Sequence, residues 1–457
     1  MQAITENTSK YFKAPREKVI FYRCAVVYIF ALYIMPQYFG IPNPIFDLTA
    51  VRIMIIVLLG LIVCDYGRFR SFNSLFLKEK AAIALLPYLF VLAYTMFFRA
   101  DINAFLNPFI EILEMFLMVY VIKDSLGTDK VIKMVTAFIY ALVILGIIEF
   151  FIKVSPFSFM VNLEGVYTGV FIRGGHYRVM SNCVHSLGYG LLLTTAMPFS
   201  GYDVKNGEYN ILRRPLLLIG IIVNIFMTGS RSTLGIMFLE LFLMFVISEK
   251  KYLKNNTLIL TACVVSFALF TFLAQKTSIG NYILLQLTSV IDSIFDTKLA
   301  ENFGSSSISM SSSTAYRHYL YNIFSVSWLN PIVGIGRKRS FHAMVNGVLI
   351  RSVDNFYIAE YIRYAYPGMI AYIFFLLFML GSMLRDIFIT KSSLIKALFV
   401  GAFCYVMHLT VVDSLQTLKY LYVLFAIYIC CDKEKKLPEV EEISLYRGKR
   451  KSKYARK

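Results

Sequence analysis

The sequence predicts an all-α, polytopic integral membrane protein with about twelve transmembrane helices. Of its 457 residues, 58% are hydrophobic and only 16% are charged, and the mean hydropathy is +0.64. A soluble domain of this size carries more charge, because its surface must face water. Apolar runs follow one another along the chain, and each is about long enough to cross ~30 Å of hydrocarbon as a helix. We therefore treat residues 1–457 as a single polytopic membrane domain.

The apolar runs define the expected spans. They are residues 19–39, 48–64, 81–98, 104–122, 134–152, 183–200, 215–229, 232–248, 257–275, 366–384, 394–412 and 416–431. Several of these runs are short, so the expected number is twelve, give or take one.

The distribution of basic residues predicts how these spans are oriented. Five loops on one side hold sixteen Lys and Arg residues, whereas four short loops on the other side hold two, Arg99 and Arg231. The basic loops are 65–80, 123–133, 201–214, 249–256 and 385–396, and the opposite loops are 40–47, 99–103, 228–232 and 412–416. Because basic loops tend to stay in the cytoplasm, both termini are expected there, including a basic tail at 432–457.

The net charge of +18 is explained by this topology rather than by nucleic-acid binding. Most of it lies in loops that flank the membrane and in the tail, where it sets orientation and can contact anionic lipids. Membrane lipids are therefore expected partners, and nucleic acid is not. The seven cysteines have no spacing that suits a zinc site, and the outer loops have no acidic cluster that suits another metal. We expect neither a metal nor a cofactor.

Two longer loops, 153–182 and 276–355, are expected to face outward although they are rich in cations. They carry, among others, Arg173, His176, Arg178, Arg317, Arg337, Lys338, Arg339 and Arg351. Such a gathering at an outer membrane face indicates an anionic ligand, such as a lipid phosphate or a phosphate-linked substrate. The large loop should form a lid of two short helices. One is an amphipathic helix around 284–299, and the other carries Arg317 after a flexible Gly304–Ser313 tether.

Three segments are candidate sites. The first runs from Arg173 to Gly188 and holds Arg173, His176, Arg178 and His185, although its arginines could simply anchor a helix end. The second is the tight turn Met227–Leu234 with Arg231 at its tip. There Ser230 or Ser232 could cap the next helix and leave N–H groups for an anion, unless this is an ordinary turn.

The third candidate segment runs from Tyr316 to Gly368. It contains Arg317, Asn330-Pro331, Gly334, Gly336, Arg337, Asp354, Glu360 and Arg363. The two glycines permit a tight backbone path. Glu360 and Arg363 are three residues apart on a helix and could simply pair with each other.

Ionisable residues also fall inside the expected spans. They are Arg23, Arg52, Glu111, Glu114, Glu149, Glu240, His408 and Lys419. Such groups are costly within a bilayer, which invites a functional interpretation. The alternative is internal pairing of the glutamates with Arg or Lys.

Taken in order, the motifs resemble those of the O-antigen polymerase and O-antigen ligase superfamily of bacterial polysaccharide assembly. Order and spacing agree over about 170–370, and hydropathy agrees over the whole chain. The matching elements are Arg178 with His185-Ser186 and Gly188, the turn Thr228–Ser232, Arg317 with Asn330-Pro331-x-x-Gly334-x-Gly336, and Asp354-Asn355-x-x-Ile358 followed by Gly368.

This resemblance implies a membrane glycosyltransferase that uses no nucleotide sugar. It would polymerise oligosaccharide repeat units carried on undecaprenyl pyrophosphate, as for O-antigen or capsular polysaccharide. The reaction would occur at the outer face of the bacterial inner (cytoplasmic) membrane, with a flippase and a chain-length regulator as expected partners. Ligases of the superfamily commonly have a histidine where this chain has Asp354, which favours a polymerase.

The chemistry of such a transfer indicates roles for particular residues. Cleavage of a sugar–pyrophosphate bond releases an anion, and guanidinium groups stay protonated and bind phosphate oxygens in pairs. The expected pyrophosphate-binding residues are Arg178, Arg231, Arg317, Arg173 and Arg337. The acceptor hydroxyl needs a base within hydrogen-bonding distance. Candidates for this base are Asp354, His185 and Glu360, with Asp354 ranked first.

Three alternatives remain open. The nearest is a ligase that transfers the finished glycan to another acceptor. A lipid-linked glycan transporter or flippase could use Glu111, Glu114 and Glu149 along a path, but no internal repeat is detectable. A glycosyltransferase using dolichol-type monosaccharide carriers usually has acidic residues in its first outer loop, and loop 40–47 offers only Asp47.

Overall fold

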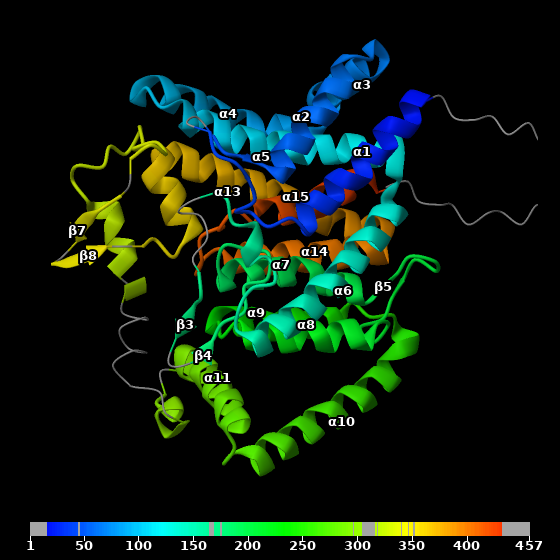
Figure 1. Cartoon of the computed structure of the whole chain (residues 1–457), viewed down its shortest axis with the longest axis vertical. Helices are drawn as coiled ribbons and strands as arrows, with labels where there is room; N and C mark the ends of the chain where they lie inside the picture. The colour runs from blue at the N-terminus through cyan, green and yellow to red at the C-terminus, as the bar shows by residue number, and fades with distance from the viewer. Residues whose placement is uncertain are drawn as a thin grey trace, which may run out of the picture.

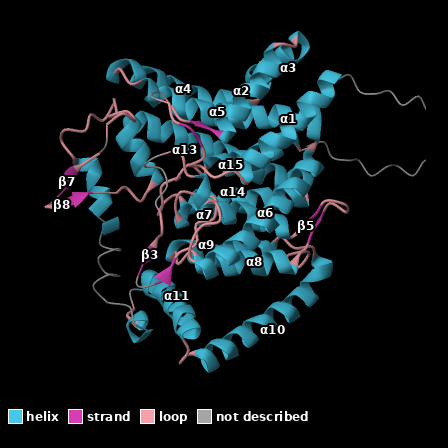
Figure 2. Cartoon of the chain, in the orientation of Figure 1, coloured by secondary structure: helices cyan, strands magenta, loops and turns pink. Residues whose placement is uncertain are grey.

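The computed structural model is mostly helical (Figures 1 and 2). It describes residues 16–43, 46–163, 169–173, 176–295, 297–303, 316–317, 319–339, 341–345, 347–350 and 352–431. The expected tail at 432–457 and the Gly304–Ser313 tether lie outside these residues. The α-helices are α1 (Arg16–Tyr33), α2 (Ala50–Val63), α3 (Tyr66–Lys78), α4 (Lys80–Arg99), α5 (Ile102–Val121), α6 (Thr128–Ile152), α7 (Ser186–Ala196), α8 (Pro215–Met227), α9 (Arg231–Val246), α10 (Lys250–Ala274), α11 (Ser278–Phe295), α13 (Phe356–Thr390), α14 (Ser393–His408) and α15 (Leu418–Cys430).

The strands of the described residues form short antiparallel hairpins only. They are β1 (Gly40–Ile41) with β2 (Leu48–Thr49), β3 (Ile172–Arg173) with β4 (His176–Tyr177), β5 (Tyr202–Asp203) with β6 (Glu208–Tyr209), and β7 (Ala343–Val345) with β8 (Val348–Ile350). Single turns of other helix types are η1 (Ile122–Leu126), η2 (Ser158–Met160), η3 (Met197–Ser200), η4 (Leu299–Phe303) and η5 (Tyr321–Ser325).

Five helices are long and apolar enough to cross a membrane, or six if the bent pair α2 and α3 forms one span. The five are α4, α5 with η1, α6, α10 and α13, and α8, α14 and α15 are shorter apolar helices. Helix α10 lies apart from the bundle (Figure 1), with only 11% of its apolar window buried, which is typical of a helix facing lipid. The structure therefore agrees with a helical membrane protein. The number of twelve spans and the cytoplasmic termini stay predictions.

Two expected loops contain structure that the sequence analysis did not predict. Loop 65–80 is largely the helix α3, which turns by 114° from α2 at a break where Asp65 caps the new helix. The large loop does contain the expected amphipathic helix, α11. Beyond it, the loop also forms the β7–β8 hairpin and a small apolar core with the start of α13, so a lid of two helices is an incomplete description. Hydropathy cannot indicate this core, because its residues are scattered through irregular segments.

Helix α13 is broken near its start. Ala365 has a positive φ of 55°, which separates the short helix 356–364 from the long helix 366–390. Pro367 has no N–H, so the carbonyl of Arg363 has no helical donor four residues later. The carbonyls of Ile362 and Arg363 are therefore available to a neighbouring segment.

Labelling with thiol reagents would test the predicted orientation. In a variant without its native cysteines, Lys338→Cys should react with a membrane-impermeant reagent applied to intact cells. Ser71→Cys should react only after permeabilisation. Both side chains are exposed, so accessibility within the protein does not limit either reaction. Labelling of Ser71→Cys in intact cells, with Lys338→Cys silent, would invert the topology.

Candidate functional site

Three of the residues predicted for the site line a single cavity of about 650 Å³, which we call the His185 cavity. His185 comes from the start of α7, Arg337 from the large loop, and Asp354 from the segment before α13. The other charged residues of the wall are Arg339, Arg363 and Asp413, with His342 beside them. The cavity therefore brings a cationic surface, a carboxylate and a histidine to one place.

His185 caps α7, and this hydrogen bond determines which of its ring nitrogens carries the proton. Its Nδ1 accepts a hydrogen bond from the backbone N–H of Leu187 at 3.1 Å. A neutral histidine with Nδ1 as acceptor carries its proton on Nε2. In this state Nε2 is a donor, so neutral His185 is suited to donating a hydrogen bond rather than to removing a proton.

Asp354 is held at the rim of the cavity by the chain that follows it. Asn355 caps α13 and donates from its side chain to the carbonyl of Thr410 at 2.6 Å. The Asp354 side chain is half-buried, and its Oδ1 accepts a hydrogen bond from the Ser352 hydroxyl at 2.7 Å. Within the described part of the chain, no donor occupies Oδ2, so this oxygen is available to a ligand.

The Gly334-x-Gly336 motif binds along the broken helix α13 and thereby positions Arg337. The backbone N–H of Ile335 donates to the carbonyl of Ile362 at 2.9 Å, and that of Gly336 donates to Arg363 at 3.0 Å. A side chain at Gly334 would collide with the Arg363 carbonyl. The expected tight backbone path is therefore confirmed, and its purpose is close contact with another segment.

Two charged residues at the end of α4 hold the same segment from the other side. Arg99 donates from Nε to the Gly334 carbonyl at 2.5 Å. The Asp101 carboxylate accepts from the backbone N–H groups of Arg337 and Lys338, both at 2.7 Å. Because these hydrogen bonds fix the backbone on both sides of Arg337, they also fix the position from which its side chain extends.

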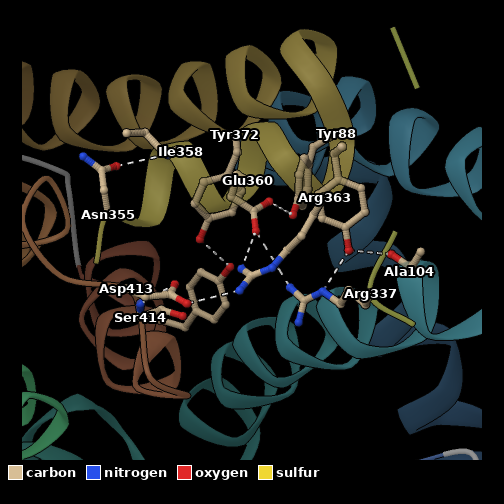
Figure 3. A network of polar contacts seen from close by, with 12 residues as sticks. Tyr88, Ala104, Arg337, Asn355, Ile358, Glu360, Arg363, Tyr372, Asp413 and Ser414 are labelled. Carbon is tan, nitrogen blue, oxygen red and sulfur yellow. Dashed lines mark hydrogen bonds and ion pairs between the residues drawn. The ribbon is translucent and has the colours of Figure 1, made fainter. Parts of the chain in front are cut away.

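The side chain of Arg337 lies in a buried polar network (Figure 3). Its Nε donates to the Tyr364 hydroxyl at 2.9 Å, and its Nη2 lies 3.9 Å from Glu360. No bond to Nη1 exists within the described residues. Burial favours the neutral guanidinium, but acidic neighbours led by Tyr364 and Glu111 outweigh it and hold the pKa of Arg337 well above its usual value. Arg337 is therefore permanently charged, and its Nη1 can still donate hydrogen bonds to a ligand.

Glu360 lies at the centre of this network, where it receives three partners (Figure 3). It accepts from the Tyr88 hydroxyl at 2.7 Å and from Arg363 at 3.2 Å, in addition to its contact with Arg337. Arg363 also reaches Asp413 at 3.1 Å. The expected pairing of Glu360 with Arg363 is thus confirmed. A carboxylate with its oxygens occupied in this way orients arginines more readily than it removes a proton.

The other predicted arginines gather around the turn before α9. Ser230 caps α9, as expected, and accepts from the N–H of Thr233 at 3.3 Å. The buried Arg178 donates from Nε to the carbonyl of Thr228 in this turn at 2.5 Å. Arg231 follows the cap and lies within electrostatic reach of Asp292 on α11.

The third arginine, Arg317, is connected to the same turn by way of the buried His408. His408 is fully buried at the end of α14, with Nε2 3.3 Å from the Ser232 hydroxyl. Arg317 lies within electrostatic reach of His408. We call the set of Arg178, Arg231 and Arg317 the α9-turn cluster.

A single aromatic ring links the α9-turn cluster to the His185 cavity. The Phe171 ring lies 4.6 Å from the ring of His185 and 4.9 Å from the guanidinium carbon of Arg178. Glu149 fixes the chain between these residues. Its carboxylate accepts from the Tyr177 hydroxyl and from the backbone N–H groups of Met180 and Ser181, at 2.8 to 2.9 Å. The described partners of Glu149 are therefore backbone amides and a hydroxyl.

A second cavity of about 360 Å³, the Lys419 cavity, lies beside the first and shares Arg337 and Asn107 with it. Its wall also contains Arg52, Glu111, Glu114 and Lys419, which the sequence analysis had placed inside spans. Internal pairing of the two glutamates was the alternative considered for them. No ion pair within 4.0 Å joins either glutamate to a cation among the described residues.

Some residues of the site were missed from the sequence, and one prediction is not placed. Asn107, Asp413 and Tyr364 had no motif to indicate them, although Asp413 is the one charged residue of the short outer loop 412–416. The side chain of Arg173 lies outside the described structure. Within that structure, no three His, Cys, Asp or Glu side chains come together as a metal site.

Comparisons with known proteins do not assign this arrangement to a family. Protein-family models gave no match, and neither did the curated proteins. The class that the structure supports is a helical membrane protein with a polar, arginine-rich site between the large loop and the helix ends.

A glycine substitution tests how the large loop is held. Gly336 has a φ of 80°, and an added Cβ would lie 2.6 Å from the Asp101 carboxylate. Gly336→Ala should therefore lower the free energy of unfolding by about 1–3 kcal/mol. The control Gly381→Ala adds a methyl group with no heavy atom within 4 Å and should not destabilise α13. Equal thermal stability of the two purified variants would contradict this docking geometry.

Proposed function

We propose that this protein polymerises lipid-linked oligosaccharide repeat units at the outer face of a bacterial cytoplasmic membrane. The observation that carries the proposal is the meeting of His185, Arg337 and Asp354 in one cavity, from three segments far apart in the chain. Together they offer a hydrogen-bond donor, a permanent cation and a carboxylate. Transfer of a glycan from undecaprenyl pyrophosphate to a hydroxyl group needs these three functions in one place.

In the proposed reaction, an acceptor hydroxyl attacks the anomeric carbon of the lipid-linked donor glycan. The new glycosidic C–O bond forms, and the bond from the anomeric carbon to the pyrophosphate oxygen breaks. The lipid pyrophosphate leaves with the bonding electron pair. Asp354 takes the hydroxyl proton on Oδ2, which makes the attacking oxygen more nucleophilic.

Two neighbouring groups stabilise the leaving anion in this scheme. The Nε2–H of neutral His185 donates to a pyrophosphate oxygen, and the Nη1 of Arg337, which has no bond within the described residues, donates beside it. Glu360 and Tyr364 act as positioning residues, because they hold the guanidinium of Arg337 in place before the substrate arrives. Donors that are fixed in advance need no reorganisation during the reaction.

The α9-turn cluster supplies further positive charge close to this cavity. We assign Arg178, Arg231 and Arg317 to binding the pyrophosphate of a lipid-linked glycan. Their support is local: Arg231 is the first residue of α9, whose N-terminus favours an anion, and Arg178 bonds the carbonyl of Thr228 in the turn just before it. Arg178 of this cluster and His185 both contact the Phe171 ring.

Deletion of the gene tests the proposed function. Cells without the protein should still place single repeat units on the outer face, because translocation precedes the proposed step. They should build no ladder of longer chains, as resolved by electrophoresis of the surface polysaccharide. Expression of the wild-type gene should restore the ladder.

The same experiment distinguishes the alternatives. Accumulation of the lipid-linked unit on the cytoplasmic face would indicate a flippase and contradict the proposal. Long chains that remain on their lipid carrier would indicate a ligase. An unchanged ladder would exclude all three functions.

A further inference from the structure

The exposed part of the His185 cavity wall lies on the large loop. Of the residues that line the cavity, three are exposed, namely Arg339, His342 and Ser352. In the chain they lie on either side of the β7–β8 hairpin, which is at one end of the helical bundle (Figure 1). We call these three residues the mouth of the cavity, because a ligand that extends out of the cavity passes them.

The cavity is too small for a whole oligosaccharide on its lipid carrier. Its volume of about 650 Å³ is within the range of pockets that hold one small ligand, about 300–1,000 Å³. A repeat unit of several sugars joined to a lipid pyrophosphate is larger than one such ligand. Part of the glycan must therefore lie outside the cavity, and the surface beside the mouth is where it would make contact.

The only tryptophan of the chain, Trp328, lies on this surface. Its ring stacks on that of Phe341, with 5.7 Å between the ring centroids and 27° between the ring planes. Phe341 itself lines the cavity and lies between Arg339 and His342 in the chain. Trp328 is 56% exposed, so one face of its indole contacts Phe341 and the other is open. We call this pair of rings the Trp328 shelf.

The small apolar core of the large loop holds the Trp328 shelf in place. Phe341 and Val326 pack against this core, and the buried Leu329 belongs to it. The N–H of Leu329 donates to the carbonyl of Val326 at 3.1 Å, so Trp328 lies in a turn that is anchored at both ends. A ring positioned in this way loses little conformational freedom when a ligand binds.

The Trp328 shelf and the mouth together suit a sugar ring. The face of an aromatic ring carries negative potential and attracts weakly positive C–H groups. A pyranose has C–H groups on its ring faces and hydroxyls around its edge. Its ring can therefore stack on the indole, while Arg339 and His342 supply hydrogen-bond donors for its hydroxyls.

A membrane interface is the other environment in which exposed tryptophans are common. Two observations favour a glycan over a lipid here. The segment that leads to Phe341 exposes Lys338 and Arg339, and His342 after it is also exposed, so this surface is strongly polar. The second observation is that the indole stacks on a residue of the cavity wall, which a membrane anchor does not require.

We propose that the Trp328 shelf is a subsite for a neutral pyranose ring in the part of a lipid-linked glycan that lies outside the His185 cavity. The ring stacks on the open face of Trp328, and Arg339 and His342 hydrogen-bond its hydroxyls. This inference rests on the proposed function for its substrate. It adds a surface that recognises the glycan, whereas the arginines already described bind pyrophosphate.

The fluorescence of the protein tests this subsite directly, because all of its tryptophan emission comes from Trp328. The probe is a mixture of oligosaccharides cut by partial acid hydrolysis from the surface polysaccharide of the same cells. Added to the purified full-length protein in vesicles, it should change the emission in a saturable way. An equal mass of mannitol, which has hydroxyls but no ring face, should not. Brominated phospholipids in the vesicles should leave the emission unquenched.

Two results of the fluorescence experiment would overturn the proposal. One is the same emission change with mannitol as with the oligosaccharides. The other is emission that does not respond to the oligosaccharides, and quenching by brominated phospholipid in that case would identify Trp328 as a membrane anchor.

Substitutions show whether the substrate uses the shelf. Trp328→Ala should raise the KM for a lipid-linked repeat unit about threefold to tenfold, as expected for one lost aromatic contact. The kcat should change little, since the shelf lies outside the cavity, and Trp328→Phe should restore most of the affinity. The control Tyr321→Ala removes another exposed ring of the large loop and should have no effect. An unchanged KM in folded Trp328→Ala, or an equal rise in Tyr321→Ala, would reject the assignment.

These results are separable from the test of the proposed function. Chain extension by the wild-type protein, with no response of Trp328 to the oligosaccharides, would keep the polymerase and reject the subsite. A saturable response without chain extension would keep a glycan-binding surface and reject the polymerase.

Discussion

Arg337→Ala should abolish chain extension while leaving the protein folded. Arg337 lines both cavities, and its Nη1, which has no bond within the described residues, is placed to contact the substrate. Loss of one preorganised donor to a developing oxyanion typically lowers the rate by about 10²–10³-fold. Arg337→Lys should remain badly impaired, because a point charge cannot bond Tyr364 and the substrate through a planar group. The measurement is the length of lipid-linked glycan made by membranes with equal amounts of each variant.

The matched control for this experiment is the next residue. Lys338 is exposed, and only its backbone N–H contacts Asp101, so Lys338→Ala should have little effect. Long polymer from folded Arg337→Ala would contradict the assigned role and leave the α9-turn cluster as the remaining pyrophosphate site.

Asp354→Asn should lower the rate by about 10²–10⁴-fold, which is the usual contribution of general-base catalysis. The amide keeps the shape of the side chain and its contact with Ser352, but it no longer takes a proton. Binding of the lipid-linked donor should be retained, because the proposed cationic contacts are unchanged. The control Glu301→Gln changes an exposed carboxylate of the large loop and should be neutral.

A variant of His185, compared with Asp354→Asn, distinguishes a donor to the leaving group from the base that takes the proton of the acceptor hydroxyl. His185→Ala should reduce turnover through loss of a donor to the leaving group, rather than through loss of a base. Near-normal turnover by Asp354→Asn would exclude Asp354 as the base, whatever the effect of His185→Ala.

The helical class could be predicted from hydropathy, because a bilayer allows few ways to satisfy the backbone. The broken start of α13 could not, although Pro367 is visible in the sequence. A proline shows where a helical hydrogen bond is missing but not which segment uses the free carbonyl. Here that segment is the Gly334-x-Gly336 motif, whose Ile335 and Gly336 bind the carbonyls of Ile362 and Arg363.

For a similar reason, only part of the candidate site could be predicted from the sequence. Motif order indicated His185, Arg337 and Asp354, and the structure brings them to one cavity. Nothing in the sequence indicated that Tyr88 and Arg337 would join Arg363 around Glu360, because these two residues come from segments far from it in the chain. It likewise identified Lys419 as an ionisable residue in a span but could not tell an internal ion pair from a cavity wall.

The most direct test of the central claim is a reconstituted reaction with a purified lipid-linked repeat unit. Wild-type protein in liposomes should convert it to longer lipid-linked glycans and release one lipid pyrophosphate for each new glycosidic bond, without any nucleotide sugar. Asp354→Asn should produce neither product in the same time. No extension by folded wild-type protein, or equal extension by the Asp354→Asn protein, would contradict the account of the His185 cavity.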